Sequence, residues 1–300
     1  MRTELVHDLS FADYCAAPGI NQSAIKLFDY ESGGCPALFK YAADHGGDPR
    51  PDTAALRSGR AYHHFLLQPD TFEKAYAVCT PEVEQQLLED AWVSQPKGKK
   101  SEKFSVRLGS FARWKQVQEA NGLEVVSHWE VKVFEEMAAA IRSSPDVAEE
   151  LRVTDQHGFE VSAFAAHKIP QLQLKARFDL VPAGDALIDL KSARSAHPTE
   201  FAKAVANNGL DIQAAVYLDV ARLNGLDKRR FGFLTQDKFP PYLAAIHWLP
   251  NDWIRYGRIR YRKILFDLGD CMKRNQWDGY RSGELTPPSW ILQEIEALAA

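Results

Sequence analysis

The sequence predicts an α/β (α+β) protein with a central mixed sheet, flanking helices and a helical N-terminal elaboration. Strand patterns lie in the middle of the chain. Residues 172–181 alternate apolar and polar side chains, as a half-buried strand does, and 186–191 form a short apolar run after a turn. Helical periodicity is clearest at 54–67 and 210–221. Strands and helices that alternate in this way favour a sheet covered by helices.

Composition is that of an ordinary globular protein, with 300 residues, 45% hydrophobic and 25% charged. The formal net charge of −4 argues against bulk coating of nucleic acid but allows a local basic channel. No apolar run is long enough to span a bilayer, and the N-terminus lacks a signal-peptide pattern, so we expect a cytoplasmic protein. We expect one domain over 1–300, with a mostly helical N-terminal region over 1–150, a sheet core over 151–250, and a C-terminal helix and tail over 251–300.

The four cysteines are scattered along the chain, and no two of them have Cys-x-x-Cys spacing. A zinc or iron–sulfur site is therefore not encoded locally. Reduced, mostly buried thiols are expected.

Two acidic residues define the candidate site. Asp179 ends the first central strand, and Asp189 and Lys191 lie two apart on the second, which puts their side chains on one face. A reverse turn between the strands would bring Asp179 close to Asp189. Converging carboxylates repel each other unless a cation lies between them, so a divalent metal is expected. The alternative is solvated strand ends with a surface lysine.

Two upstream residues are candidates for the same metal site. Gly59 and His63 stand one turn apart on one face of the 54–67 helix. Gly59 lets another backbone or a substrate come close to this face, and the His63 imidazole is a possible metal ligand. A helical histidine that is only a surface or core residue is the alternative. His64 points about 100° away and is assigned no role. Glu160, in the strand expected near 156–164, could act on a metal through water.

Gln213 and Tyr217 lie one turn apart on the 210–221 helix. Both can donate hydrogen bonds to a phosphate oxygen or a water. The alternative is a core tyrosine with a satisfied hydroxyl.

Three further segments carry weaker signals, and the second of them lies on a long predicted C-terminal helix. Residues 80–103 are expected to be poorly ordered, and their basic stretch is either a solvated loop or a mobile flap that contacts phosphates through Lys97, Lys99 and Lys100. Residues 255–263 interleave tyrosines with cations, which fits a nucleic-acid face or a solvated helix face equally well. The tail at 285–290 is expected to be extended, with Trp290 packed down.

Together these residues resemble the PD-(D/E)xK nuclease superfamily and, within it, the RecE-type (exonuclease VIII) branch of phage-type exodeoxyribonucleases. Each motif alone is weak, but their common order is specific. The motifs are Gly59-x-x-x-His63, Glu160, Lys175-x-Arg177-x-Asp179, Asp189-x-Lys191 and Gln213-x-x-x-Tyr217. The resemblance covers nearly the whole chain and implies a restriction-endonuclease-like core.

The resemblance implies a role for each site residue. Hard carboxylate oxygens select Mg²⁺ or Mn²⁺, and an imidazole ligand favours Mn²⁺. Asp179 and Asp189 are expected to bind the metal directly, and the Leu190 carbonyl and His63 are expected to complete its shell. Lys191 is expected to position or deprotonate the attacking water, while Gln213 and Tyr217 orient the water and the phosphate. Lys175 and Arg177 are expected to bind nearby phosphates.

The resemblance also implies degradation of one strand of linear duplex DNA, 5′ to 3′, to leave 3′ overhangs. It implies a ring-like homo-oligomer around the DNA and a RecT-type single-strand annealing partner. Two other interpretations stay open: an endonuclease with the same core, and a catalytically silent DNA-binding or assembly module.

Overall fold

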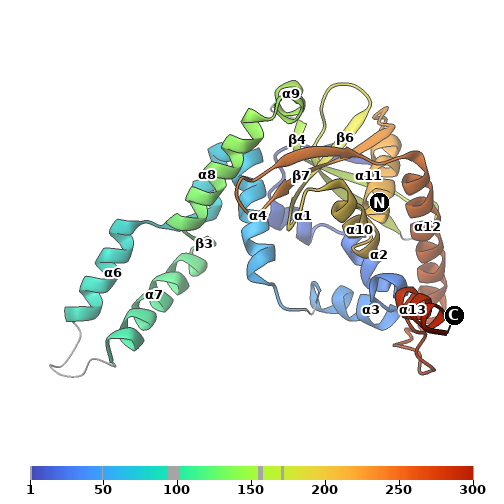
Figure 1. Cartoon of the computed structure of the whole chain (residues 1–300), viewed down its shortest axis with the longest axis horizontal. Coiled ribbons are helices and arrows are strands. Elements are labelled where there is room, and N and C mark those ends of the chain that lie inside the picture. The colour runs from blue at the N-terminus through green and yellow to red at the C-terminus, as the bar shows by residue number, and fades with distance from the viewer. Residues whose placement is uncertain (1, 49, 94–101, 155–157, 170–171, 300) are drawn as a thin grey trace.

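A mixed β-sheet forms the centre of the molecule (Figure 1). The computed structural model describes residues 2–299 except 49, 94–101, 155–157 and 170–171. Within these residues the sheet has six strands, and all neighbouring strands are antiparallel except the parallel pair β6–β7. In spatial order the strands are β1 (Glu4–Val6), β4 (Phe159–Ala166), β5 (Gln173–Leu180), β6 (Ala186–Ala193), β7 (Arg230–Asp237) and β8 (Ala244–Trp248).

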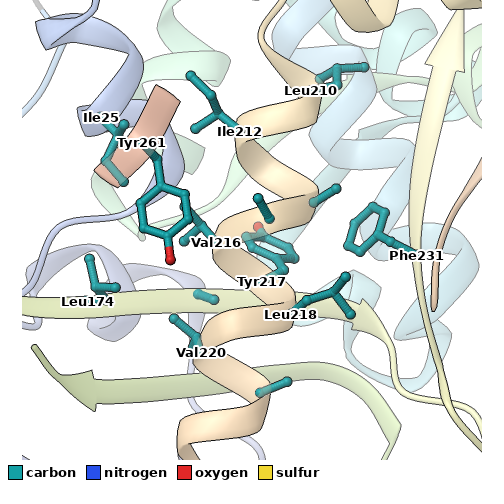
Figure 2. Close-up of a cluster of buried hydrophobic side chains, with 14 of the residues drawn as sticks. Ile25, Leu174, Leu210, Ile212, Val216, Tyr217, Leu218, Val220, Phe231 and Tyr261 are labelled. Atoms are coloured by element: carbon teal, nitrogen blue, oxygen red, sulfur yellow. The ribbon is translucent and has the colours of Figure 1, made fainter. Parts of the chain in front are cut away.

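One face of the sheet is covered by α11 (Leu210–Leu223), whose residues are buried from Leu210 to Ala221. A helix that is mostly apolar on all sides can be enclosed in this way. Figure 2 shows its side chains directed towards the sheet strands on one side and towards Tyr261 on the other. Tyr261 belongs to α12 (Asn251–Arg274), which packs on the outer side of α11. Three further helices complete this layer: α2 (Gln22–Phe28), α3 (Pro36–His45) and α10 (Pro198–Asn207).

The other face of the sheet carries a second apolar cluster, which includes Tyr62, Phe134, Ile188 and Leu190. Leu187 packs with α11 on the first face, whereas Ile188 packs on the second, so neighbouring β6 side chains point to opposite faces as a strand requires. The elements on this side are α4 (Ala54–Leu67), α5 (Phe72–Ala75), α8 (His128–Ser143) and α9 (Pro145–Val153), with a small parallel sheet of β2 (Tyr76–Cys79) and β3 (Glu124–Ser127).

Two helices form an arm that extends away from this body (Figure 1). They are α6 (Pro81–Val93) and α7 (Glu102–Ala120). The expectation of poor order over 80–103 is therefore wrong for α6. Its start signal was present in the sequence: the Thr80 hydroxyl accepts a hydrogen bond from Val83 N (3.3 Å), Pro81 suits a first turn, and Glu82 and Glu84 favour the positive end of the helix dipole.

The expectation for the tail holds for residues 285–288, which form no helix or strand, but is wrong from Ser289 onwards. Residues 289–299 form α13 (Ser289–Ala299), and Trp290 is 63% exposed rather than packed down. Pro287 and Pro288 end the extended segment, and the Pro288 carbonyl already accepts the Ile291 N–H at 2.9 Å, so the helix begins directly after the prolines. The remaining short elements are α1 (Phe11–Ala16), η1 (Tyr30–Ser32) and η2 (Pro69–Thr71).

Strand β5 is buried along its whole length, whereas its alternating pattern predicted a half-buried strand. The N-terminal segment covers the polar side of the strand. Lys175 Nζ donates hydrogen bonds to the carbonyls of Tyr14 (2.9 Å), Cys15 (3.0 Å) and Ala17 (2.7 Å). Polar side chains that are buried but hydrogen-bonded thus give a strand the same alternation of apolar and polar residues as a strand with one side in solvent. None of the helices in the described residues is long and apolar enough to cross a membrane.

Candidate active site

Asp179 and Asp189 lie opposite each other where β5 and β6 meet. Leu180 pairs with Ile188, and the antiparallel register then places Asp179 across from Asp189. Asp179 Oδ2 accepts a hydrogen bond from Leu190 N at 2.8 Å, so the carboxylate itself links the two strands at this point. The short turn between the strands therefore brings the two acidic groups together.

Two other elements add ligand atoms around Asp179. Nδ1 of His63, on α4, lies 3.4 Å from Asp179 Oδ2. On β4, Glu160 is opposite Asp179, because the flanking pairs Phe159–Leu180 and Val161–Phe178 are in register. One ligand atom from each of His63, Glu160 and Asp179 lies within 4.8 Å of the others. Glu160 has φ of 53°, a left-handed conformation that non-glycine residues adopt rarely and often at functional sites.

The sequence of α4 explains how His63 reaches the sheet. Thr53 caps the helix by accepting the Leu56 N–H at 3.2 Å. Gly59 then lies next to β6: a Cβ added there would meet only Ser192 Oγ, at 3.7 Å. Since Gly59 and His63 share one face of the helix, the contact that brings Gly59 to β6 also turns His63 towards Asp179.

The second carboxylate, Asp189, is held from the α11 side. Gln213 Nε2 donates to Asp189 Oδ1 at 2.5 Å, and Lys191 Nζ forms an ion pair with Asp189 Oδ2. Gln213 thus contacts the acid directly. Tyr217 is buried, and its ring packs edge-on against Phe178. It also packs edge-on against Phe231 (Figure 2). The core contact and a site role are compatible, because Tyr217 also lies near the site residues. Burial raises the pKa of Tyr217, the charge of Asp189 adds to the rise, and a hydrogen bond with Gln213 opposes it.

Burial raises the pKa of all three carboxyl groups. For Asp179 the rise is large, because burial is joined by repulsion from Asp189 and Glu160. The pKa of Asp189 is raised by burial, against the opposing charge of Lys191. The pKa of Glu160 is raised by burial, against the charge and hydrogen bond of Arg177. Crowded carboxyl groups of this kind are characteristic of functional sites.

The two basic groups respond in opposite directions. Burial and the charge of Lys191 lower the pKa of His63 to about 3, so its imidazole is neutral at physiological pH and has a lone pair for a metal. A hydrogen bond with the Leu190 main chain acts against this shift and places that peptide beside the ring. Burial lowers the pKa of Lys191, but Asp189 and Asp179 outweigh burial and raise it overall.

The residues fit a hard divalent cation. Asp189 Oδ2 is buried and faces the Lys191 ammonium group, with which it forms an ion pair. Two or three carboxylates and a neutral imidazole match the ligand chemistry of Mg²⁺ or Mn²⁺. His63, Glu160 and Asp179 would hold such an ion, Asp189 lies across from Asp179 on the next strand, and the Leu190 main chain lies beside the His63 ring.

The phosphate-binding roles expected for Lys175 and Arg177 do not fit their surroundings. Both side chains are buried, and both use protein acceptors. Arg177 Nε donates to Glu160 Oε2 at 2.5 Å, and its Nη1 donates to the Leu9 carbonyl (2.7 Å) and to Ser162 Oγ (3.0 Å). Arg177 thus orients Glu160, and Lys175 fastens the end of α1. Alternation could not distinguish these roles from contacts with DNA.

Two further outcomes concern basic residues. Lys97, Lys99 and Lys100 lie outside the described residues, so their expected contact with phosphates stays a prediction. Sequence reasoning missed Lys26, on α2. Burial lowers the pKa of Lys26 to about 8, with repulsion from Lys191, and its Nζ donates to the Asn208 carbonyl at 3.1 Å. Only the packing of α2 on α11 brings it near the site, so no local signal could have found it.

Comparisons with known proteins concern the family and the fold of the chain. The family model "PDDEXK-like domain of unknown function (DUF3799)" matches residues 22–286. A crystal structure from Eubacterium rectale, described as a "Putative exonuclease", is similar in fold, with 15% identity, a TM-score of 0.57, and coverage of 95% of this chain and 98% of that one. LHK-Exo in complex with dAMP shares 13% identity over 72% of this chain and 96% of its own, with a TM-score of 0.29. No curated protein matches the sequence.

The family match covers most of the chain and includes every residue of the cluster around Asp179. The mixed sheet with helices on both faces is the fold that the family description implies. The chain belongs to the PDDEXK-like family (DUF3799) and has the fold of a PD-(D/E)xK nuclease.

Proposed function

We propose that the chain is a divalent-metal-dependent exodeoxyribonuclease that degrades linear double-stranded DNA from 5′ to 3′ and leaves 3′ single-strand overhangs for recombination by strand annealing. The observation that carries the proposal is the cluster of His63, Glu160 and Asp179, with ligand atoms within 4.8 Å, next to Asp189 and Lys191. The polarity rests on the resemblance to the RecE-type branch.

Phosphodiester cleavage requires charge neutralisation at the phosphate and a water delivered in line. A bound Mg²⁺ or Mn²⁺ supplies Lewis-acid polarisation and an acidified water. Asp179 and Asp189 hold the ion, and Gln213 fixes the orientation of Asp189 through its hydrogen bond. Glu160 is fixed in turn by Arg177, so both acids are preorganised before substrate arrives.

Lys191 is the proposed residue for positioning or deprotonating the attacking water. The charges of Asp189 and Asp179 hold its pKa up. Neutralisation of those charges removes the cause of the raised pKa and favours the neutral amine that a general base needs. Tyr217 and Gln213 would orient the water and the scissile phosphate from the α11 side.

The proposal includes partners and a setting. A single-strand annealing protein of the RecT type would receive the 3′ overhang, and the enzyme would act in the cytoplasm as a ring-like homo-oligomer around DNA. A closed ring explains how a chain with net charge −4 could stay on its substrate, since enclosure does not depend on overall charge.

The test is digestion of linear duplex labelled at either 5′ or 3′ ends, with Mg²⁺ or Mn²⁺, beside closed circular duplex. We expect early release of the 5′ label and survival of the circle. Asp189→Asn should lower the rate on the order of 100-fold or more, because an anionic ligand and the ion-pair partner of Lys191 are lost. Asp185→Asn, in the turn before β6, is the matched control and should keep full activity.

Each other outcome has a distinct meaning. Early release of the 3′ label would overturn the polarity, and cutting of the circle would indicate an endonuclease. Binding of DNA without turnover at any metal concentration would indicate a silent module. Equal activity of Asp189→Asn and the wild type would refute the site.

A further inference from the structure

The last helix, α13, has an apolar surface that the chain itself does not cover. Leu292, Ile295 and Leu298, at helical i, i+3, i+6 spacing on one side of the helix, are 44%, 55% and 82% exposed. A helix of 11 residues is marginal in water without packing partners. Exposed apolar patches on globular proteins mark interaction sites. The α13 surface is therefore a candidate interaction site.

A second apolar stripe runs along the outer side of α12. Ile259 and Phe266 are seven residues apart and hence on one face of the helix, and they are 59% and 72% exposed. Tyr256, 48% exposed, continues the stripe one turn earlier. The inner side of α12 packs on α11, and Figure 1 shows α12 at the edge of the molecule, so this stripe faces outwards.

The two surfaces carry opposite charges. The charged residues of α13 are Glu294 and Glu296, with no lysine or arginine in the sequence of 289–299. The α12 stripe is bordered by exposed Arg255, Arg262 and Lys263. Arg262 also contacts Asp219 and Lys263 contacts Asp267, so part of their charge is already compensated, and Arg255 is the exposed arginine beside the start of the stripe.

The α13 face is short enough to lie on the α12 stripe. At 1.5 Å per residue, the stripe from Tyr256 to Phe266 is about 15 Å long, and the α13 face from Leu292 to Leu298 is about 9 Å long. Within one chain both stay exposed, so α13 does not cover its own α12 stripe. Exposed Ile259 and Phe266 also favour a protein over DNA as the occupant, because phosphates give no reward for burying aliphatic surface.

We propose that α13 of one copy of this chain docks on the α12 stripe of the next copy, with its apolar face on Tyr256, Ile259 and Phe266 and its glutamates beside the arginines. The contact joins two different surfaces, so it is head-to-tail and closes into a ring when the rotation between copies permits. The inference rests on the homo-oligomer in the proposed function and deepens it by naming the two surfaces.

Cross-linking tests the pairing directly. Two chains of different mass, one with Ile259→Cys and one with Ile295→Cys, both carrying Cys15→Ser to remove the exposed native thiol, are mixed and treated with a short bis-maleimide. We expect a product with the summed mass of the two chains. The control pair replaces Ile295→Cys by Leu56→Cys, on α4, which is 58% exposed and outside both surfaces. No summed-mass product above the control, or an internal cross-link in a chain that carries both cysteines, overturns the proposal.

Sedimentation of the full chain gives a second measurement. Phe266→Glu and Leu298→Glu, each at an exposed position, should weaken assembly about tenfold or more while circular dichroism stays native. Unchanged assembly in both variants contradicts the docking. Two variants separate this proposal from the nuclease proposal. Asp189→Asn should lose DNA cleavage and keep the oligomer. Phe266→Glu should keep metal-dependent cleavage of short linear duplex and lose the oligomer.

Discussion

Lys175 and Arg177 show how a polar residue in a strand can serve the fold instead of the substrate. Lys175 donates to three carbonyls at the end of α1, and Arg177 connects Glu160 with the Leu9 carbonyl. These bonds hold the N-terminal segment over β5, close to the carboxylates. The two cations therefore affect the site by positioning its neighbours.

Lys175→Met should lower the free energy of unfolding by about 2 kcal/mol, because three buried carbonyls lose a charged donor. Urea denaturation measures the change. The salt dependence of DNA binding should stay as in the wild type, since the ammonium group does not reach phosphates. A normal unfolding curve together with a shallower salt slope would restore the phosphate-binding role.

Gly59→Ala should separate stability from activity. The added methyl group would meet only Ser192 Oγ at 3.7 Å, an ordinary contact, and alanine is a better helix former by about 0.8–1 kcal/mol. The variant should therefore be slightly more stable. If the open space beside β6 admits the DNA backbone, KM for duplex rises and kcat changes little. An unchanged KM would show that the glycine is not needed for substrate access.

At the scale of elements, the contact between α11 and α12 is close and charged. A Cβ at Gly257 would lie 2.1 Å from the Asp211 carbonyl, so the helices cross almost backbone to backbone. Asp219, buried on α11, accepts from Arg258 at 2.9–3.1 Å and from the Tyr261 hydroxyl. This joint fixes α11, which carries Gln213 and Tyr217.

Gly257→Ala should cost more than about 2 kcal/mol of stability, because the methyl group can be placed only by moving the helix backbones apart. Thermal unfolding measures the loss. Gly109→Ala, on α7, is the matched control: no atom lies within 4 Å of its Cβ, so it should be neutral or slightly stabilising. Equal unfolding temperatures for the two variants would contradict the packing of α12 on α11.

Asp219→Asn should destabilise the joint in a pH-dependent way. Burial alone would raise the pKa of Asp219, but the hydrogen bonds from Arg258 and Tyr261 outweigh it and lower the pKa. A depressed carboxyl pKa contributes stability that is complete above the unfolded value, about 3.9, and is lost as pH falls through the folded value. The variant should cost about 3 kcal/mol at pH 7, and the difference should shrink below about pH 4.

Urea unfolding at pH 7 and pH 3 checks this expectation. Asp227→Asn provides the control, because Asp227 is exposed and pairs with Arg229 at 3.2 Å, where an ion pair contributes about 1 kcal/mol or less. A deficit of Asp219→Asn that stays constant down to pH 3 would show that its charge is not the cause.

For the whole molecule, the acidic cluster couples metal binding to folding. Asp179, Asp189 and Glu160 repel one another inside the protein, so an ion that binds the folded state stabilises it. At 100 times its Kd such an ion adds about 2.7 kcal/mol. Thermal unfolding with Mn²⁺ should therefore occur at a higher temperature than with chelator. Asp179→Asn should abolish this shift and, with chelator, be as stable as the wild type or more stable. A full Mn²⁺ shift in the variant would place the ion elsewhere.

The sequence by itself determined the local features of this protein. The periodicity of 54–67 predicted α4 with its bounds, and the two central runs predicted the strands that bring Asp179 opposite Asp189. These features depend on neighbours within a few residues, and side-chain alternation and helix caps report them directly. The order of the motifs also indicated the family, which the match over 22–286 supports.

Only the tertiary structure decided which polar groups meet. Lys26 approaches the site through the packing of α2, Lys175 and Arg177 turn inwards under the N-terminal segment, and α13 lies exposed at the end of the chain. A side chain's partners come from elements far away in sequence, and burial changes its charge and role without changing the local pattern. Local periodicity therefore specifies elements, whereas function here depends on long-range contacts.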